Sequence, residues 1–112
     1  MKREELPKRY REFSDRYPEI AAEYEKLGSL IHGQSTLDAR TRALVKLALA
    51  VGARMEGGVH AQVRRALAAG VKPDELRQVG LLSITTIGFP AAMAAMSWID
   101  DLLPRKLFRR RS

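Results

Sequence analysis

Glu56 and His60 are the residues whose types and spacing best suit chemistry in this chain. They stand four positions apart, and on a continuous helix that spacing places two side chains on the same face. A carboxylate beside an imidazole raises the basicity of the imidazole and selects its tautomer. A pair of this kind is the least that general acid or base catalysis requires. The pair is therefore a candidate catalytic site. There are two structural alternatives. The residues could form a surface ion pair, or the histidine could make its hydrogen bonds within a subunit interface.

A metal site is a weaker interpretation of the same pair. Two ligands per chain would need further copies around a symmetry axis to complete a coordination sphere. We therefore predict neither a metal nor a cofactor. His32 stands at the expected end of a helix beside Gly33, where a cation favours the local dipole, so helix capping is its predicted role.

Three further side chains are candidate contacts to a small-molecule ligand. Gln62 and Arg64 follow His60 in the same segment, and an arginine there could pair with a ligand carboxylate. A solvated helix face that includes Arg65 explains Arg64 equally well. Met55 could line an apolar pocket, or could fill a gap in the core as methionines commonly do.

The chain contains no cysteine, which excludes disulfides, thiolate metal sites and thiol catalysis. Its 112 residues match the size of a single domain, which we expect over residues 1–104. The charged start of the sequence, MKREELP, lacks the apolar stretch of a secretory signal. We therefore expect a cytoplasmic protein.

The net charge of +7 raises the question of nucleic-acid binding. Acidic residues are interleaved through the first third of the chain, however, and much of the excess lies in the run RKLFRRR at residues 105–111. We expect residues 105–112 to form a basic tail that is solvated or contacts another subunit. A salt-sensitive contact between this tail and nucleic acid is the less favoured alternative.

Apolar residues recur at three- and four-residue intervals throughout the chain, and no useful strand-like alternation interrupts them. The predicted fold is all-α, a compact bundle of about six helices. The helices are expected near residues 6–16, 18–32, 38–51, 59–70, 73–87 and 90–99, with the start of the fourth left open by Gly57 and Gly58. The apolar face of the fifth should carry Leu76, Val79, Ile87 and either Leu82 or Ser83.

Residues 80–99 carry no charge and approach the length of a membrane span. A Gly-Phe-Pro break at residues 88–90 divides the stretch, so two buried helices explain it better and no membrane contact is expected. The second of these helices is apolar on nearly all sides. One neighbour cannot cover a whole circumference in a small domain, so its outer face is predicted to meet another copy of the chain.

Three stretches together resemble the carboxymuconolactone decarboxylase superfamily, which includes the alkylhydroperoxidase D proteins. They are LDARTRAL at 37–44 running into LALAV at 47–51, ALAAGVKPDEL at 66–76, and GFPAA at 88–92. Their order and separations fit without gaps, and the likeness covers residues 37–99. The resemblance implies an all-helical subunit of a homotrimer, or of a homohexamer built from trimers.

The peroxidase branch of this family uses a Glu, a CxxC pair and a His four positions after the second Cys. In the ungapped register those four positions hold Ala43, Met55, Gly58 and Gln62. A thioether cannot become a thiolate, glycine has no side chain, and an amide is no base near neutral pH. These replacements argue against the peroxidase mechanism.

The decarboxylase branch also lacks the cysteine pair, and it acts on a cyclic lactone acid with help from a His in the same helix region. His60 lies two positions before that place, so the family's histidine is not transferred to it. We predict a family member without the dithiol that binds or converts a small carboxylate- or carbonyl-bearing molecule, with His60 as acid or base and Glu56 orienting it. The alternative is a catalytically inactive, homo-oligomeric binding or scaffold protein.

Overall fold

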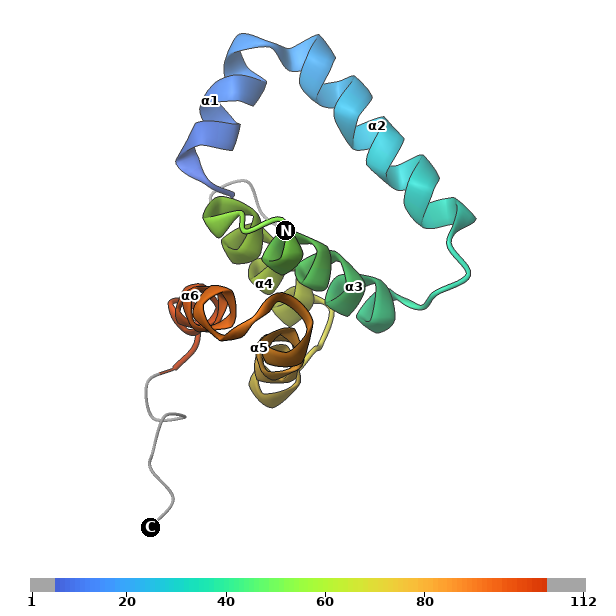
Figure 1. Cartoon of the computed structure of the whole chain (residues 1–112). Helices are drawn as coiled ribbons and strands as arrows, with labels where there is room; N and C mark the ends of the chain where they lie inside the picture. The colour runs from blue at the N-terminus through green and yellow to red at the C-terminus, as the bar shows by residue number, and fades with distance from the viewer. Residues whose placement is uncertain (1–5, 105–112) are drawn as a thin grey trace. The chain divides into compact units, whose positions relative to one another are not determined.

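A computed structural model describes residues 6–104, and this part of the chain holds six helices and no strand (Figure 1). The helices are α1 (Lys8–Arg16), α2 (Pro18–Gln34), α3 (Ala39–Gly52), α4 (Glu56–Ala68), α5 (Pro73–Ile87) and α6 (Phe89–Asp100). The predicted all-α class is confirmed, and each expected helix is present within a few residues of its predicted bounds. The start of α4, which the glycine pair left open, lies at Glu56.

The helices fall into two compact units that divide after Asp38. In the first unit, the Tyr10 hydroxyl of α1 donates to Glu25 of α2 at 2.9 Å. The tilted rings of Phe13 and Tyr17, the residue between the two helices, have centroids 5.3 Å apart. Ala21 is the one buried residue of this unit among those described.

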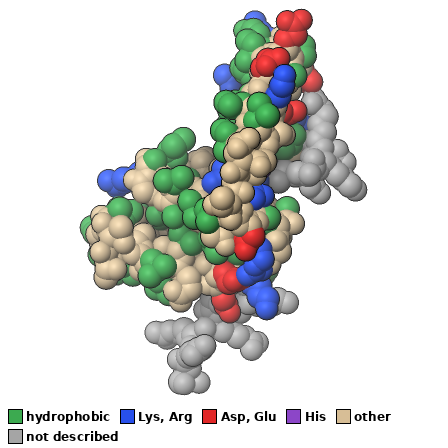
Figure 2. Space-filling model, turned by 90° about the vertical axis from the view of Figure 1, so that its right-hand side faces the viewer, with side chains coloured by type: hydrophobic (Ala, Val, Ile, Leu, Met, Phe, Trp, Pro, Cys, Tyr) green, Lys and Arg blue, Asp and Glu red, His purple; other side chains and the backbone are tan. Residues whose placement is uncertain are grey.

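The apolar stripe of α2 is largely exposed to solvent. Its members recur at four-, three- and four-residue spacings, and their exposed fractions run from 53% to 66%. They are Ile20, Tyr24, Leu27 and Ile31. Hydrophobic side chains also reach the surface in many places on the face drawn in Figure 2. A 17-residue helix with this much unburied apolar area is a surface that monomeric proteins seldom present to water.

The hydrophobic core lies in the second unit, where α3 packs against α4 and α5 packs against α6. Its fully buried side chains come from all four helices at helical spacing, which is why these segments fold together. They include Leu47, Val59, Val63, Leu76 and Ile99. Burying a side chain of this size stabilises the fold by about 1.5–3 kcal/mol.

Gly80 of α5 lies against the Met96 side chain of α6. A Cβ atom added at Gly80 would lie 2.6 Å from Cγ of Met96, so a larger residue there would force the Met96 side chain or the helix to shift. One turn later Ser83 is buried, and its hydroxyl donates to the Gly80 carbonyl at 2.6 Å. Of the two residues expected at this point of the apolar face, Ser83 is the buried one and Leu82 is 64% exposed.

Gly88 separates α5 from α6 with a φ of +98°, a conformation that favours glycine. Pro90 then lies in the first turn of α6, where its missing N–H costs nothing. The uncharged stretch thus forms two helices, as predicted, and no helix within residues 6–104 is long and apolar enough to cross a membrane. Ala92, Ala95 and Ile99 of α6 are buried, whereas Phe89 and Met93 are exposed.

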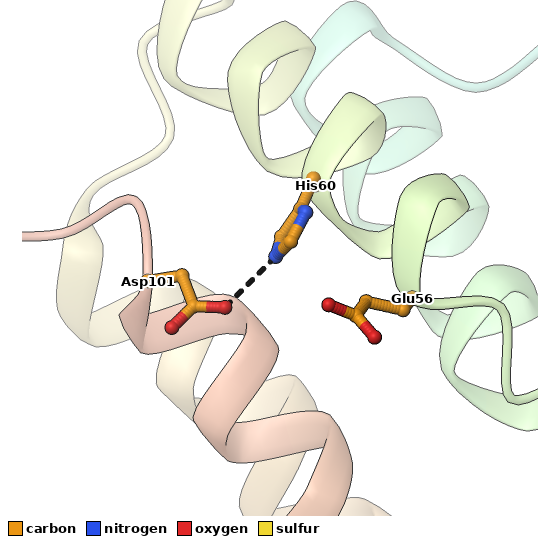
Figure 3. A group of neighbouring side chains, drawn as sticks. All are labelled: Glu56, His60 and Asp101. Atoms are coloured by element: carbon orange, nitrogen blue, oxygen red, sulfur yellow. Dashed lines mark hydrogen bonds and ion pairs between the residues drawn. The ribbon is translucent and has the colours of Figure 1, made fainter.

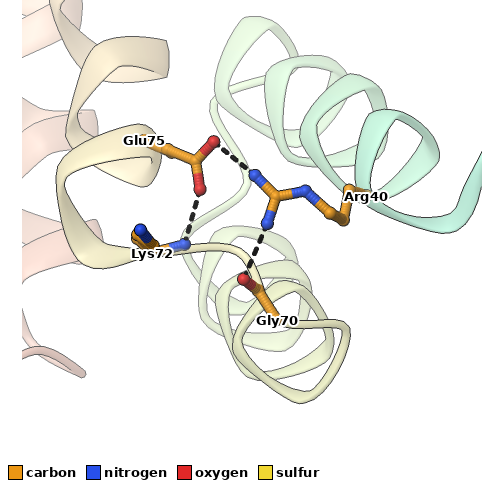
Figure 4. A network of polar contacts seen from close by, with 4 residues as sticks. All are labelled: Arg40, Gly70, Lys72 and Glu75. Carbon is orange, nitrogen blue, oxygen red and sulfur yellow. Dashed lines mark hydrogen bonds and ion pairs between the residues drawn. The ribbon is translucent and has the colours of Figure 1, made fainter.

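Arg40 ties the start of α3 to the turn between α4 and α5 (Figure 4). Its guanidinium donates to the Gly70 carbonyl at 2.8 Å and to the Glu75 carboxylate at 2.5 Å. Glu75 also accepts the backbone N–H of Lys72 at 2.9 Å, which satisfies an unpaired donor at the start of α5. These two hydrogen bonds, the backbone one first, lower the pKa of Glu75. Gly70 takes a φ of +88°, a conformation that favours glycine where a helix such as α4 ends.

Candidate functional site

His60 and Asp101 form the central contact of the candidate site (Figure 3). His60 Nε2 lies 3.0 Å from Asp101 Oδ2, a hydrogen-bonding distance. His60 projects from α4, and Asp101 directly follows α6, so packing of α4 against α6 brings the two together. The neighbouring Val59 and Val63 are fully buried, which holds this part of α4 in place.

Glu56 is the third member of the group. It lies one turn before His60, in the first turn of α4, where the positive end of the helix dipole favours a carboxylate. One ligand atom from each of Glu56, His60 and Asp101 lies within 4.8 Å of the others. In Figure 3 the Glu56 carboxylate faces the contact between His60 and Asp101. Their four-residue spacing on α4 places Glu56 near His60. The hydrogen-bond partner of the imidazole, however, is Asp101.

Two carboxylates at the end of α6 give this corner of the second unit a negative character. Asp100 and Asp101 sit where the helix dipole is also negative, an arrangement that calls for cationic partners. Asp100 has one, because Arg77 Nε donates to it at 3.1 Å. Burial nevertheless outweighs the arginine and raises the pKa of Asp100. The partner of Asp101 is His60.

The side chain of His60 is partly shielded, with 22% of it exposed, whereas that of Asp101 is 53% exposed. If Nε2 donates its proton to Asp101, Nδ1 carries the lone pair of the neutral ring and is the nitrogen that can accept a proton. A carboxylate in this position also stabilises the imidazolium once it forms. The arrangement can therefore accept and return a proton at one ring nitrogen.

The other three residues predicted to contact a small-molecule ligand, Met55, Gln62 and Arg64, differ in their position around α4. Arg64 stands one turn beyond His60 and so shares its face. Gln62 is two positions from His60, which is about 200° around the helix, so it points towards another side. Met55 precedes the first turn of α4. Arg64 is thus the one of the three that the helix aligns with His60.

Two of the family's four redox positions lie at the start of α4 beside the candidate site, since Met55 precedes Glu56 and Gly58 lies between Glu56 and His60. A Cβ atom added at Gly58 would lie 3.1 Å from Cβ of Met55 and 3.6 Å from its Cε methyl. Met55 therefore fills the space next to Gly58 that a side chain there would need. Ala43 is buried in the core, where a methyl group replaces the family's carboxylate.

An apolar pocket of about 380 Å³ lies between α3 and α5, within the second unit. Its walls include Leu44, Val51, Val79 and Leu82. None of the candidate site residues Glu56, His60 and Asp101 lines it. Met55, which the sequence offered as a pocket residue, does not line it either. The helical pattern predicted an apolar face that includes Val79 and Ile87, and both residues line the pocket. The pattern gives no sign that the helices leave a gap between these side chains.

Asp101 is the site residue that sequence reasoning missed. It lies two positions beyond the predicted end of the sixth helix at residue 99, and 41 positions separate it from His60. No local spacing rule connects the two, since only the packing of α4 on α6 brings them together. The predicted basic tail, including 105–111, lies outside the described residues.

Comparison with known proteins assigns the family. Residues 18–101 match the model of the carboxymuconolactone decarboxylase family. The match covers well over half of the chain, so the protein belongs to this family. Comparisons with curated proteins and with solved structures give no match.

Proposed function

We propose that this cysteine-free member of the carboxymuconolactone decarboxylase family carries out acid–base chemistry on a small carboxylate- or carbonyl-bearing molecule, with His60 as the proton-transferring group. The observation that carries the proposal is the 3.0 Å contact between His60 Nε2 and Asp101 Oδ2. Asp101 takes the orienting role that the sequence pattern had assigned to Glu56. Glu56 remains beside the pair without that role.

In the proposed step, Nδ1 of neutral His60 removes a proton from a carbon next to the substrate's carbonyl. The electron pair of the broken C–H bond moves into the carbonyl group, which becomes an enolate. Asp101 stabilises the imidazolium through Nε2–H, and the imidazolium then returns a proton to carbon. Arg64, on the same face of α4, is placed to pair with a carboxylate of the substrate.

Proton exchange at carbon tests this step without requiring the natural substrate. Small 2-oxo acids and unsaturated lactone acids are incubated with the protein in D₂O containing a chelator, and proton NMR follows the loss of the signal next to the carbonyl. The wild type should exchange at least one of them. His60→Gln should lower that rate by about 100-fold or more, the usual contribution of a positioned acid or base.

Asp101→Asn should lower the rate less severely than His60→Gln, because the base is kept and its orientation is lost. His32→Gln is the matched control, since it removes the chain's only other histidine. Exchange that persists in His60→Gln, or no exchange with any compound of the panel, would overturn the proposal.

A second candidate is an oligomeric binding or scaffold protein. It is supported by the exposed apolar stripe of α2, defined by Ile20, Tyr24, Leu27 and Ile31. Such a surface is expected to be covered by another protein surface, and a second copy of the same chain is the simplest partner in a family expected to form trimers or hexamers. Self-association is compatible with the acid–base function, so both are proposed together.

A further inference from the structure

Glu56 is a carboxylate that the proposed proton transfer does not use. It nevertheless lies with His60 and Asp101 in a group whose ligand atoms are all within 4.8 Å of one another. We infer that Glu56, His60 and Asp101 bind a divalent transition-metal cation of the Zn²⁺ type. The pair Glu56 and His60 was too small a ligand set by itself, and Asp101 supplies the third ligand.

The geometry is close to what such a cation needs. A Zn²⁺ ion about 2.0–2.2 Å from each ligand atom holds those atoms about 3.4 Å apart in a tetrahedral site. His60 Nε2 and Asp101 Oδ2 already lie 3.0 Å apart. Glu56 and Asp101 are both exposed, so their carboxylates have room to turn towards an ion, and the ligand atoms of the three residues already lie within 4.8 Å of one another.

The electrostatics of the corner independently favour a cation. Asp101 lies at the negative end of the α6 dipole and next to another carboxylate, Asp100. Arg77 is bonded to Asp100, and Asp101 is paired with His60. A neutral imidazole brings no positive charge, whereas a divalent ion would offset both Asp101 and Glu56.

The mixture of ligand types indicates which cation class is bound. An imidazole nitrogen suits Zn²⁺, Co²⁺ and their neighbours, while hard cations such as Mg²⁺ prefer oxygen ligands alone. Three protein ligands leave a tetrahedral position open for water, as in catalytic rather than structural zinc sites.

Metal binding and the proposed proton transfer exclude each other, because both depend on the orientation and protonation of the same imidazole. The cation should therefore inhibit the acid–base reaction, and this regulatory part of the inference rests on the proposed function. The binding part does not, since it is measured in the absence of any substrate.

Titration with Co²⁺ tests the binding, using the full chain without a histidine tag. The wild type should bind one Co²⁺ per chain and develop visible absorption, which Zn²⁺ should abolish by competition. Glu56→Gln should weaken Co²⁺ binding by at least about tenfold, and His60→Gln should do so as well. His32→Gln is the matched control and should bind as the wild type does.

Glu56→Gln also separates the two proposals. It should lose metal affinity but keep proton exchange in the presence of a chelator, because Asp101 still orients His60. Zn²⁺ should suppress exchange in the wild type far more than in Glu56→Gln. Absence of Co²⁺ binding, or binding that is unchanged in His60→Gln and lost in His32→Gln, would overturn the metal site whatever the exchange assay shows.

Discussion

His60 Nε2 and Asp101 Oδ2 meet at 3.0 Å although 41 positions separate the two residues. The contact joins the middle of α4 to the residue that follows α6, so it exists only when the core between these helices is formed. A side-chain pair assembled in this way depends on the fold and not on one helix alone.

The contact between His60 and Asp101 should nevertheless add little to stability. Asp101 is half exposed, and exposed ion pairs contribute about 0–1 kcal/mol. Urea unfolding of His60→Gln, Asp101→Asn and the double variant should give a coupling free energy within that range. A coupling free energy above about 2 kcal/mol would contradict this prediction and would show that the contact between His60 and Asp101 stabilises the fold.

Acid should weaken the link that Glu75 makes with Lys72 and Arg40. The hydrogen bonds of the folded state lower the pKa of Glu75, so its carboxylate favours folding above its unfolded pKa. That contribution should disappear as the pH falls from about 4.3 through the lower folded value. Urea unfolding at several pH values should therefore show Glu75→Gln less stable than the wild type at pH 7, with a smaller difference in acid.

Asp74→Asn is the control for Glu75, because Asp74 lies in the same first turn of α5. Its stability difference from the wild type should change less between pH 7 and acid. A constant deficit of Glu75→Gln at every pH would contradict the assignment.

Gly80→Ala should destabilise the packing of α5 on α6. The added methyl would lie 2.6 Å from Met96 Cγ, and overpacking of this kind costs about 1–3 kcal/mol. Thermal unfolding should show the loss, and Met96→Ala should relieve part of it in the double variant. Gly57→Ala is the control, since no atom lies within 4 Å of its added methyl. Equal stability of Gly80→Ala and Gly57→Ala would contradict the close contact.

The apolar stripe of α2 should control self-association. Light scattering during size-exclusion chromatography should give the wild type about three or six times the 12.6 kDa mass of one chain. Tyr24→Lys combined with Leu27→Lys should shift the mass towards the monomer, because two charges cannot be buried unpaired at an interface. Ser29→Lys, about half a turn away around α2, should not. A wild-type monomer would end the proposal of self-association.

Cysteines placed at the family's redox positions should form a disulfide but not a peroxidase. Cβ atoms at positions 55 and 58 lie 3.1 Å apart, slightly closer than the usual 3.5–4.5 Å of disulfides. Mass spectrometry after mild oxidation should show the loss of two hydrogens from Met55→Cys/Gly58→Cys, and less so from Met55→Cys/Gly57→Cys. Peroxide consumption with a dithiol reductant should stay at background, because Ala43 and Gln62 supply neither acid nor base.

Sequence reasoning predicted the helices well because their apolar residues recur at helical spacing and because glycines and prolines mark their ends. Pro18 begins α2 and Pro73 begins α5, whereas Gly88 separates α5 from α6. The same reasoning placed Glu56 beside His60, since both lie on one helix.

What local spacing could not supply was contacts between helices. Asp101 reaches His60 through tertiary packing, and Ser83 replaces Leu82 in the core because the Gly80 carbonyl satisfies its hydroxyl. The outer face of α6 was expected to hold the main unpartnered apolar surface. It exposes Phe89 and Met93, whereas the broader exposed stripe lies on α2.

The position of the Met55 side chain bears on how this chain could return to the family's redox chemistry. With Met55 in place, a cysteine at position 58 meets both its Cβ and its Cε, so that change alone crowds the start of α4. A cysteine at position 55 removes the methyl group, but its Cβ still lies 3.1 Å from a Cβ at position 58. The tightest contact therefore remains with any side chain at position 55, so a dithiol requires a small shift at the start of α4 in whichever order the two cysteines are introduced.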